Sequence, residues 1–85
     1  MSDPSTSEVL RRARAALSAS PIYDLRELLV EKVGDALELS GDVDSWHHKQ
    51  LAQEVVRAVA GKKSVINVVE VRKYPAYAYN EASVF

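Results

Sequence analysis

Apolar residues between Glu8 and Ser18 recur at the spacing of a helix that buries one side. These apolar positions are Val9, Leu10, Ala13, Ala16 and Leu17. Ser5 stands three residues before Glu8, which is the spacing of a capping box at a helix start. Ser20-Pro21 follows the segment, and the residue before a proline avoids the α region. The pattern predicts a first helix over 8–18. Residues 23–29 fit either a helical turn or the entry to a strand.

The next two segments alternate between apolar and polar residues on either side of Gly34-Asp35. A two-residue turn that begins with glycine is typical of a type II′ β-hairpin, because glycine accepts a positive φ. Such a turn pairs residue 33 with 36, 32 with 37, 30 with 39 and 28 with 41. In this register one face of the hairpin carries four large apolar side chains, namely Leu28, Val30, Leu37 and Leu39.

A second helix and a third strand complete the pattern. Asp44 and Ser45 are residue types that cap helices, and apolar residues then recur at helical spacing over 46–60 up to Gly61, a typical C-cap. Residues 64–72 are rich in β-branched side chains and predict a strand, which the following Tyr74-Pro75 ends. The order helix, strand, strand, helix, strand predicts an α+β two-layer sandwich. In it, two helices pack on one face of a three-stranded mixed sheet. We expect this domain over 7–73, with terminal tails over 1–6 and 74–85.

The composition limits which binding partners and which cellular location we expect. The chain has 85 residues and a formal net charge of −1, so no overall field draws it to nucleic acid or to an anionic membrane. It contains no cysteine, which excludes thiolate chemistry and disulfides. No apolar run reaches the ~20 residues that span a bilayer, and residues 1–7 do not resemble a signal peptide. If Met1 is the native start, we expect a cytoplasmic or peripheral membrane location.

Candidate chemistry is sparse. His47 and His48 are adjacent, so they point about 100° apart on a helix, and no third histidine is present to complete a zinc site. Ser40 precedes a glycine but lies in no nucleophile motif. The run 61–64 has a single glycine, whereas an RNA-clamping loop of the KH type needs two. We therefore expect no catalytic residue, no metal and no cofactor, and we consider nucleic acid an unlikely partner.

The stretch 37–45, Leu-Glu-Leu-Ser-Gly-Asp-Val-Asp-Ser, resembles the BON domain of bacterial envelope and stress proteins. The resemblance extends over roughly 9–71. It also includes Lys49, Val55, Val59, Val69 and Val71. Its motif positions, which we expect to be structural, are Gly41, Val43, Ser45, Ala52, Gly61, Val65 and Asn67. The resemblance implies no catalytic residue. It implies attachment to phospholipid or to envelope-associated partners, in proteins that are often periplasmic and often connected with osmotic stress.

The strand register leaves one face of the sheet uncovered by helices. The apolar residues expected there, our candidate binding face, are Leu29, Val33, Ile66 and Val68. They lie among Glu31, Glu38, Glu70 and Arg72. Such an apolar cluster is typical of a contact surface. Three occupants are possible. The face can dock another protein or a second copy, it can contact lipid acyl chains, or it can lie under the chain's own tail. The apolar side chains of that tail are Tyr74, Tyr77, Tyr79 and Phe85.

Overall fold

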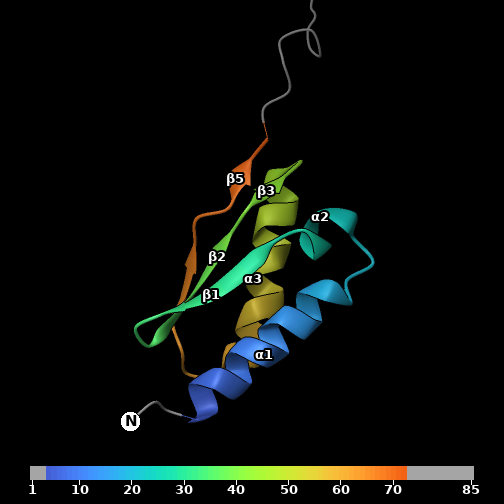
Figure 1. Cartoon of the computed structure of the whole chain (residues 1–85). Coiled ribbons are helices and arrows are strands. Elements are labelled where there is room, and N and C mark those ends of the chain that lie inside the picture. The colour runs from blue at the N-terminus through green and yellow to red at the C-terminus, as the bar shows by residue number, and fades with distance from the viewer. Residues whose placement is uncertain (1–3, 73–85) are drawn as a thin grey trace, which may run out of the picture.

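The computed structural model describes residues 4–72, and these form a three-stranded sheet and a two-stranded sheet with helices on one side (Figure 1). Its helices are α1 (Pro4–Ser18), α2 (Tyr23–Arg26) and α3 (Trp46–Ala60). Its strands are β1 (Leu29–Val33), β2 (Ala36–Ser40), β3 (Asp42–Val43), β4 (Val65–Asn67) and β5 (Glu70–Val71). The expected α+β two-layer sandwich is therefore confirmed, with a single turn, α2, added between the first helix and the hairpin.

The hairpin forms in the predicted register. Residues 33 and 36, 32 and 37, and 30 and 39 are partners in the antiparallel β1–β2 ladder. Gly34 has φ 60°, and among residues 4–72 only glycines have a positive φ, so Asp35 does not. This combination fits the predicted type II′ turn, whose second central residue has a negative φ.

The third strand lies beside β2, which gives the order β1-β2-β4 with β2 and β4 parallel. The sheet is mixed as expected, but the segments 36–43 and 64–72 are each divided into two short strands. Leu37 pairs with Val65 and Asp42 pairs with Glu70, an offset of 28 residues in both ladders (65 − 37 and 70 − 42). The β3–β5 pair therefore continues the β2–β4 pair without a change of register.

The interruption follows from the backbone at two positions. Gly41 has φ 127°, outside the range of a strand, and it separates β2 from β3. In the opposite chain, the Asn67 side-chain oxygen accepts a hydrogen bond from the backbone N–H of Val69 at 3.1 Å. This local bond bends the chain between β4 and β5. The bonds from Val68 N to Leu39 O and from Glu70 N to Gly41 O, both 2.9 Å, still hold the two segments together.

The helix boundaries show one difference from prediction. The first helix begins at Pro4, so Ser5 lies inside it and the capping-box prediction is wrong. Proline favours the first helical position because its fixed φ is helical and it has no N–H to satisfy there. The Glu8 side chain instead accepts hydrogen bonds from Arg11 and Arg12 on the next turn. The second helix has the predicted ends: Ser45 accepts from the His48 N–H at 3.1 Å, and Gly61 is the C-cap with φ 62°.

The core lies between α1, α3 and the inner face of the sheet. It consists of Ala13, Leu17, Leu25, Leu28, Val30, Leu37, Leu39, Val43, Ala52, Val56, Ala60 and Val69. The four hairpin residues predicted to face the helices are all in this set. Burial of a Leu or Val side chain contributes about 1.5–3 kcal/mol, so this alternation alone fixes which face the helices cover.

Candidate functional site

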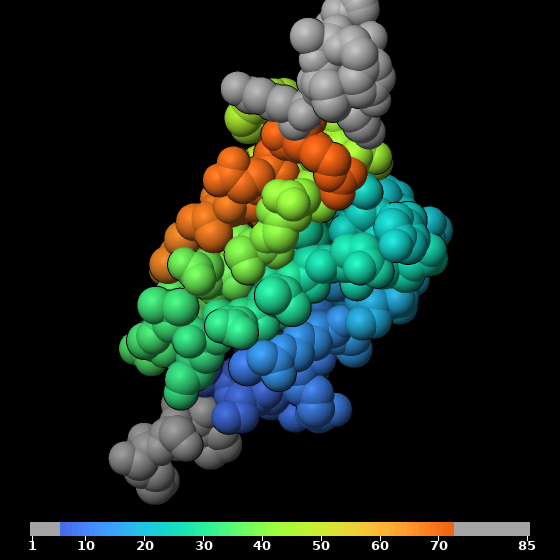
Figure 2. Space-filling model, turned by 45° about the horizontal axis from the view of Figure 1, so that its top comes forward, coloured from blue at the N-terminus to red at the C-terminus, as the bar shows by residue number. Residues whose placement is uncertain are grey.

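The outer face of the sheet carries the four apolar residues of the candidate binding face. Leu29 is 60% exposed, Val33 48%, Ile66 40% and Val68 45%. Figure 2 shows the strands as adjacent bands, orange for β4 and β5, light green for β2 and β3, and green for β1, with no helix across them. We call this surface the open face. Leu29 and Val33 lie on the edge strand β1, Ile66 lies on the other edge strand β4, and Val68 follows β4.

Two pairs of carboxylates share the open face with these residues. Glu31 is the direct cross-strand partner of Glu38, and Asp42 is the direct partner of Glu70. Side chains alternate along a strand, and the neighbours Val30, Leu39 and Val43 are buried against the helices. All four carboxylates therefore lie on the side away from the helices. The open face is therefore apolar and acidic in its centre and toward β3 and β5.

Basic side chains lie at the two ends of the open face. Lys62 and Lys63 follow α3 and, with Val33 and Ala36, line a hollow at the hairpin end. Arg72 follows β5 at the other end, where its guanidinium contacts the Asp44 carboxylate. Positive charge therefore flanks the acidic centre.

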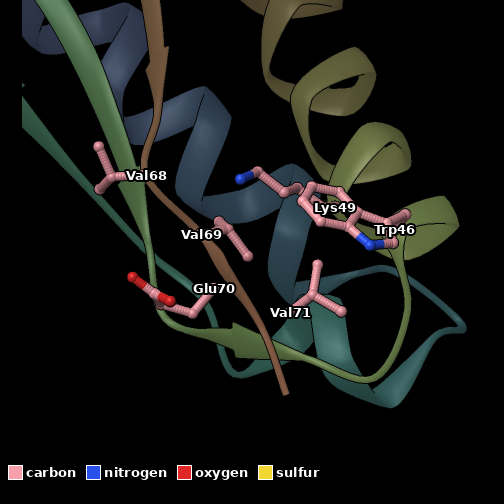
Figure 3. A pocket seen from close by; sticks show the side chains of 6 residues that line it. All are labelled: Trp46, Lys49, Val68, Val69, Glu70 and Val71. Atoms are coloured by element: carbon pink, nitrogen blue, oxygen red, sulfur yellow. The ribbon is translucent and has the colours of Figure 1, made fainter. Parts of the chain in front are cut away.

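A groove runs along the inner side of β5 where the sheet meets the start of α3 (Figure 3). It has a volume of about 450 Å³ and is lined by Trp46, Lys49, Val68, Val69, Glu70 and Val71. Trp46 is 71% exposed, and the Lys49 Nζ lies 5.1 Å from the centre of its ring, a cation–π contact. In Figure 3, Val69 and Val71 point toward α3 while Val68 and Glu70 point to the opposite side of the strand. Val68 and Glu70 thus belong both to the lining of the groove and to the open face.

At each edge of the sheet, a side chain forms a hydrogen bond with a backbone group of the edge strand. The Arg14 Nε donates to the Val30 carbonyl at 3.2 Å on the β1 edge. On the opposite edge the Asn67 amide donates to the Lys49 carbonyl and to Gln53, each at 3.1 Å, while its oxygen accepts from Val69 N. Occupied edge groups hinder the addition of a further strand. On each edge, at least one backbone group is therefore already bonded to a side chain.

A buried carboxylate joins α2, α3 and the last strand. Asp24 is 7% exposed, accepts from the Asp44 N–H at 2.7 Å, and lies 2.9 Å from His48 Nδ1. Burial raises the pKa of Asp24, but the hydrogen bonds from His48 and Asp44 and the charge of Arg72 together hold it below its usual 3.8. The group supports the fold at one end of the groove. Sequence reasoning missed it, because nothing in the segment 23–29 marks one aspartate as buried.

The family-motif residues build the scaffold. Gly41 faces Leu28, where a Cβ would lie 2.7 Å from the Leu28 Cδ2. Ser45 and Gly61 cap α3, Asn67 ties the edge strand to α3, and the remaining three, Val43, Ala52 and Val65, are buried in the core or packed against it. Trp46 and Lys49 were not predicted to form a site, although their spacing of three residues on a helix is one at which side chains meet.

The described residues contain neither a cluster of metal ligands nor a helix that could span a membrane. Within residues 4–72 no three His, Asp or Glu side chains gather as metal ligands, and the His47 and His48 rings are 6.1 Å apart. Over the same residues no helix is long and apolar enough to cross a bilayer.

In this sandwich, helices cover one face of the sheet and leave the other face open. Its polar side chains mostly cap helices, join neighbouring segments by hydrogen bonds or form ion pairs. This is the structure of a small binding domain. Comparison with known families agrees. The chain belongs to the BON domain family, whose model matches residues 8–73. That family is generally a non-enzymatic binding domain, which suggests a binding module. No curated protein matches the chain.

Proposed function

We propose that this BON domain is an adaptor that docks a protein partner through its open face. The observation that carries the proposal is the exposure of four large apolar side chains, Leu29, Val33, Ile66 and Val68, on a face that no described helix covers. Exposed apolar side chains gathered on one face are typical of interaction surfaces. The occupied edge groups at Val30 and Val69 favour docking on the face over strand addition.

Attachment to phospholipid, which the family resemblance implies, stays a prediction, and the charges of the open face argue against it. Each basic residue near an anionic leaflet contributes about 1 kcal/mol of attraction, and carboxylates such as Glu31, Glu38 and Glu70 oppose it. The rival occupant, the tail over 74–85, lies outside the described residues. A protein partner is therefore the occupant that we propose.

A double substitution on the open face tests the proposal against a matched control. Val33→Glu with Val68→Glu adds two charges to the face. Ala15→Glu with Ala58→Glu adds the same two charges to exposed helix positions on the far side. We expect wild type and control to retain a protein from a cell extract that rebinds after purification, and the face variant to lose it. We also expect no co-sedimentation of any variant with phosphatidylcholine vesicles or with vesicles that include phosphatidylglycerol.

Three results would overturn this function. The first is vesicle binding that the face variant loses, which would make the open face a membrane surface. The second is a partner retained equally by both double variants, which would place docking elsewhere. The third is the absence of both a partner and vesicle binding with wild type. Circular dichroism of each variant confirms that it is folded before it is used.

A further inference from the structure

The carboxylates of the open face are arranged at a cost to the fold. Glu31 and Glu38 lie directly opposite each other in the antiparallel ladder, and Asp42 and Glu70 do so in the parallel one. Like charges directly opposite each other destabilise a sheet, whereas a Glu–Lys or Thr–Thr pair at either position would stabilise it. The isolated domain therefore has two pairs of negative charges that lack a cross-strand cation.

The Glu31–Glu38 pair stands between the apolar residues, and the Asp42–Glu70 pair lies next to them, beyond Val68. Glu38 is the direct partner of Ile66 in the β2–β4 ladder, and Glu70 follows Val68 by two residues on the same side of the strand. A partner that covers the apolar residues must also cover the carboxylates. Carboxylates that lose water without gaining a cation or a hydrogen-bond donor cost several kcal/mol, so the chemistry of the partner is constrained.

Basic side chains near the open face have other contacts or lie at its ends. Arg72 contacts Asp44, Arg14 donates to the Val30 carbonyl, and Lys62 and Lys63 lie at the hairpin end. Among residues 4–72, no ion pair joins a cation to Glu31, Glu38 or Glu70. A second copy docked face to face would bring the same carboxylates, and a phosphate-bearing surface would bring more negative charge.

We propose that the partner of the open face is a protein surface that carries lysine or arginine side chains among apolar ones. One cation of the partner meets the Glu31–Glu38 pair and another meets the Asp42–Glu70 pair, while the apolar side chains contact Ile66 and Val68. This inference rests on the proposed function and specifies, in addition, that the partner's surface is positively charged. Each carboxylate pair serves binding at the expense of the stability of the free domain.

Two synthetic peptides of equal length and equal leucine content test the charge preference, one with lysine and one with glutamate at the polar positions. The full-length ¹⁵N-labelled chain is titrated with each at low salt. The lysine peptide should shift the amide signals of β1, β2, β4 and β5, and the glutamate peptide should leave them unchanged. The Kd for the lysine peptide should rise about five-fold in the Glu31→Gln/Glu38→Gln variant, as expected for the loss of two exposed ion pairs.

The control variant removes two exposed carboxylates that lie on no strand, Glu27→Gln/Glu54→Gln, and so matches the change in net charge. It should bind the lysine peptide like wild type. Glu31→Gln/Glu38→Gln should also melt at a higher temperature than wild type while it binds less well, which loss of structure cannot produce. Equal shifts with both peptides, shifts confined to α1 and α3, or equal weakening in the two Gln variants would overturn the inference. If such a result coincides with a partner lost on Val33→Glu/Val68→Glu, the proposed function stands and only the charge assignment falls.

Discussion

Gly41→Ala should destabilise this domain more than alanine at either of the other two glycines. Gly41 has φ 127°, and a Cβ added there would lie 2.7 Å from the Leu28 Cδ2 and 3.5 Å from the Leu28 Cα. Leu28 is only 7% exposed, so its side chain has little room to turn away. Alanine at position 41 therefore meets both a backbone penalty and a steric one.

The two penalties can be sized separately. A non-glycine residue held at such a φ costs about 1–3 kcal/mol, and overpacking a buried contact costs about 1–3 kcal/mol more. Gly61 has φ 62° with nothing within 4 Å of an added Cβ, so Gly61→Ala incurs only the first penalty. Both changes restrict the unfolded chain to the same extent, so that effect cancels in the comparison. Gly41→Ala should be the less stable of the two by about 1–3 kcal/mol.

Urea unfolding followed by far-UV circular dichroism measures this difference. Trp46 is 71% exposed and is a poor reporter of unfolding, so fluorescence is not the signal of choice. With a slope of about 1 kcal/mol per molar urea for a small domain, the midpoint of Gly41→Ala should lie about 1–3 M below that of Gly61→Ala. Domains of this length have a total stability of only about 4–13 kcal/mol, so Gly41→Ala is expected to unfold early in the titration.

A double-mutant cycle identifies the steric partner. If the added Cβ presses on Leu28, removing the Leu28 side chain should relieve part of the cost, and Leu28→Ala with Gly41→Ala should couple by about 1 kcal/mol. Equal midpoints for Gly41→Ala and Gly61→Ala would refute the steric reasoning. So would a cycle that is additive to within about 0.5 kcal/mol.

Three further changes test the contacts that hold the scaffold, each by urea unfolding. Asn67→Ala loses three hydrogen bonds and should cost about 1.5–3 kcal/mol; a loss below 0.5 kcal/mol would mean that the tie between the edge strand and α3 is not formed. Ser45→Ala removes the N-cap of α3 and should cost about 1 kcal/mol, with Ser45→Thr close to wild type as its control. Asp24→Asn should lose stability near neutral pH. Because the pKa of Asp24 is lowered by folding, its carboxylate stabilises the fold above 3.8 and ceases to do so as the pH falls through the lowered value. The gap between wild type and Asp24→Asn should therefore narrow in acid, and a constant gap would contradict the assignment.

The turn and the register of the hairpin were predictable because each part of their signal is local. Gly34 sets the turn, the turn sets the register, and the two-residue alternation assigns Val30 and Leu39 to the core and Leu29 and Val33 to the open face. A register shift of one residue would have exposed every core residue of the hairpin. The prediction therefore had few alternatives once the turn was recognised.

The features that the sequence did not predict depend on contacts between distant segments. The break between β2 and β3 needs the approach of Gly41 to Leu28, thirteen residues earlier in the chain (41 − 28). The burial of Asp24 needs the N–H of Asp44 and the ring of His48. Neither contact leaves a periodic signal. The start of α1 was misplaced for a different reason, since a capping-box spacing of Ser and Glu occurs by chance and Pro4 is equally good as a first helical residue.

The positions that identify the family are not those that can choose a partner. Gly41, Ser45 and Asn67 act within the fold, the first at a close approach to Leu28, the second as a helix cap and the third as a tie between α3 and the edge strand. The open face is instead composed of Leu29, Val33, Ile66, Val68 and the carboxylates between them, none of which belongs to the motif. Because a residue on the open face contributes little to the core, it can change without loss of the fold. Under the proposed function, the scaffold can therefore stay the same while the charge of the open face changes with the partner, and it is this charge that a search for the partner should use.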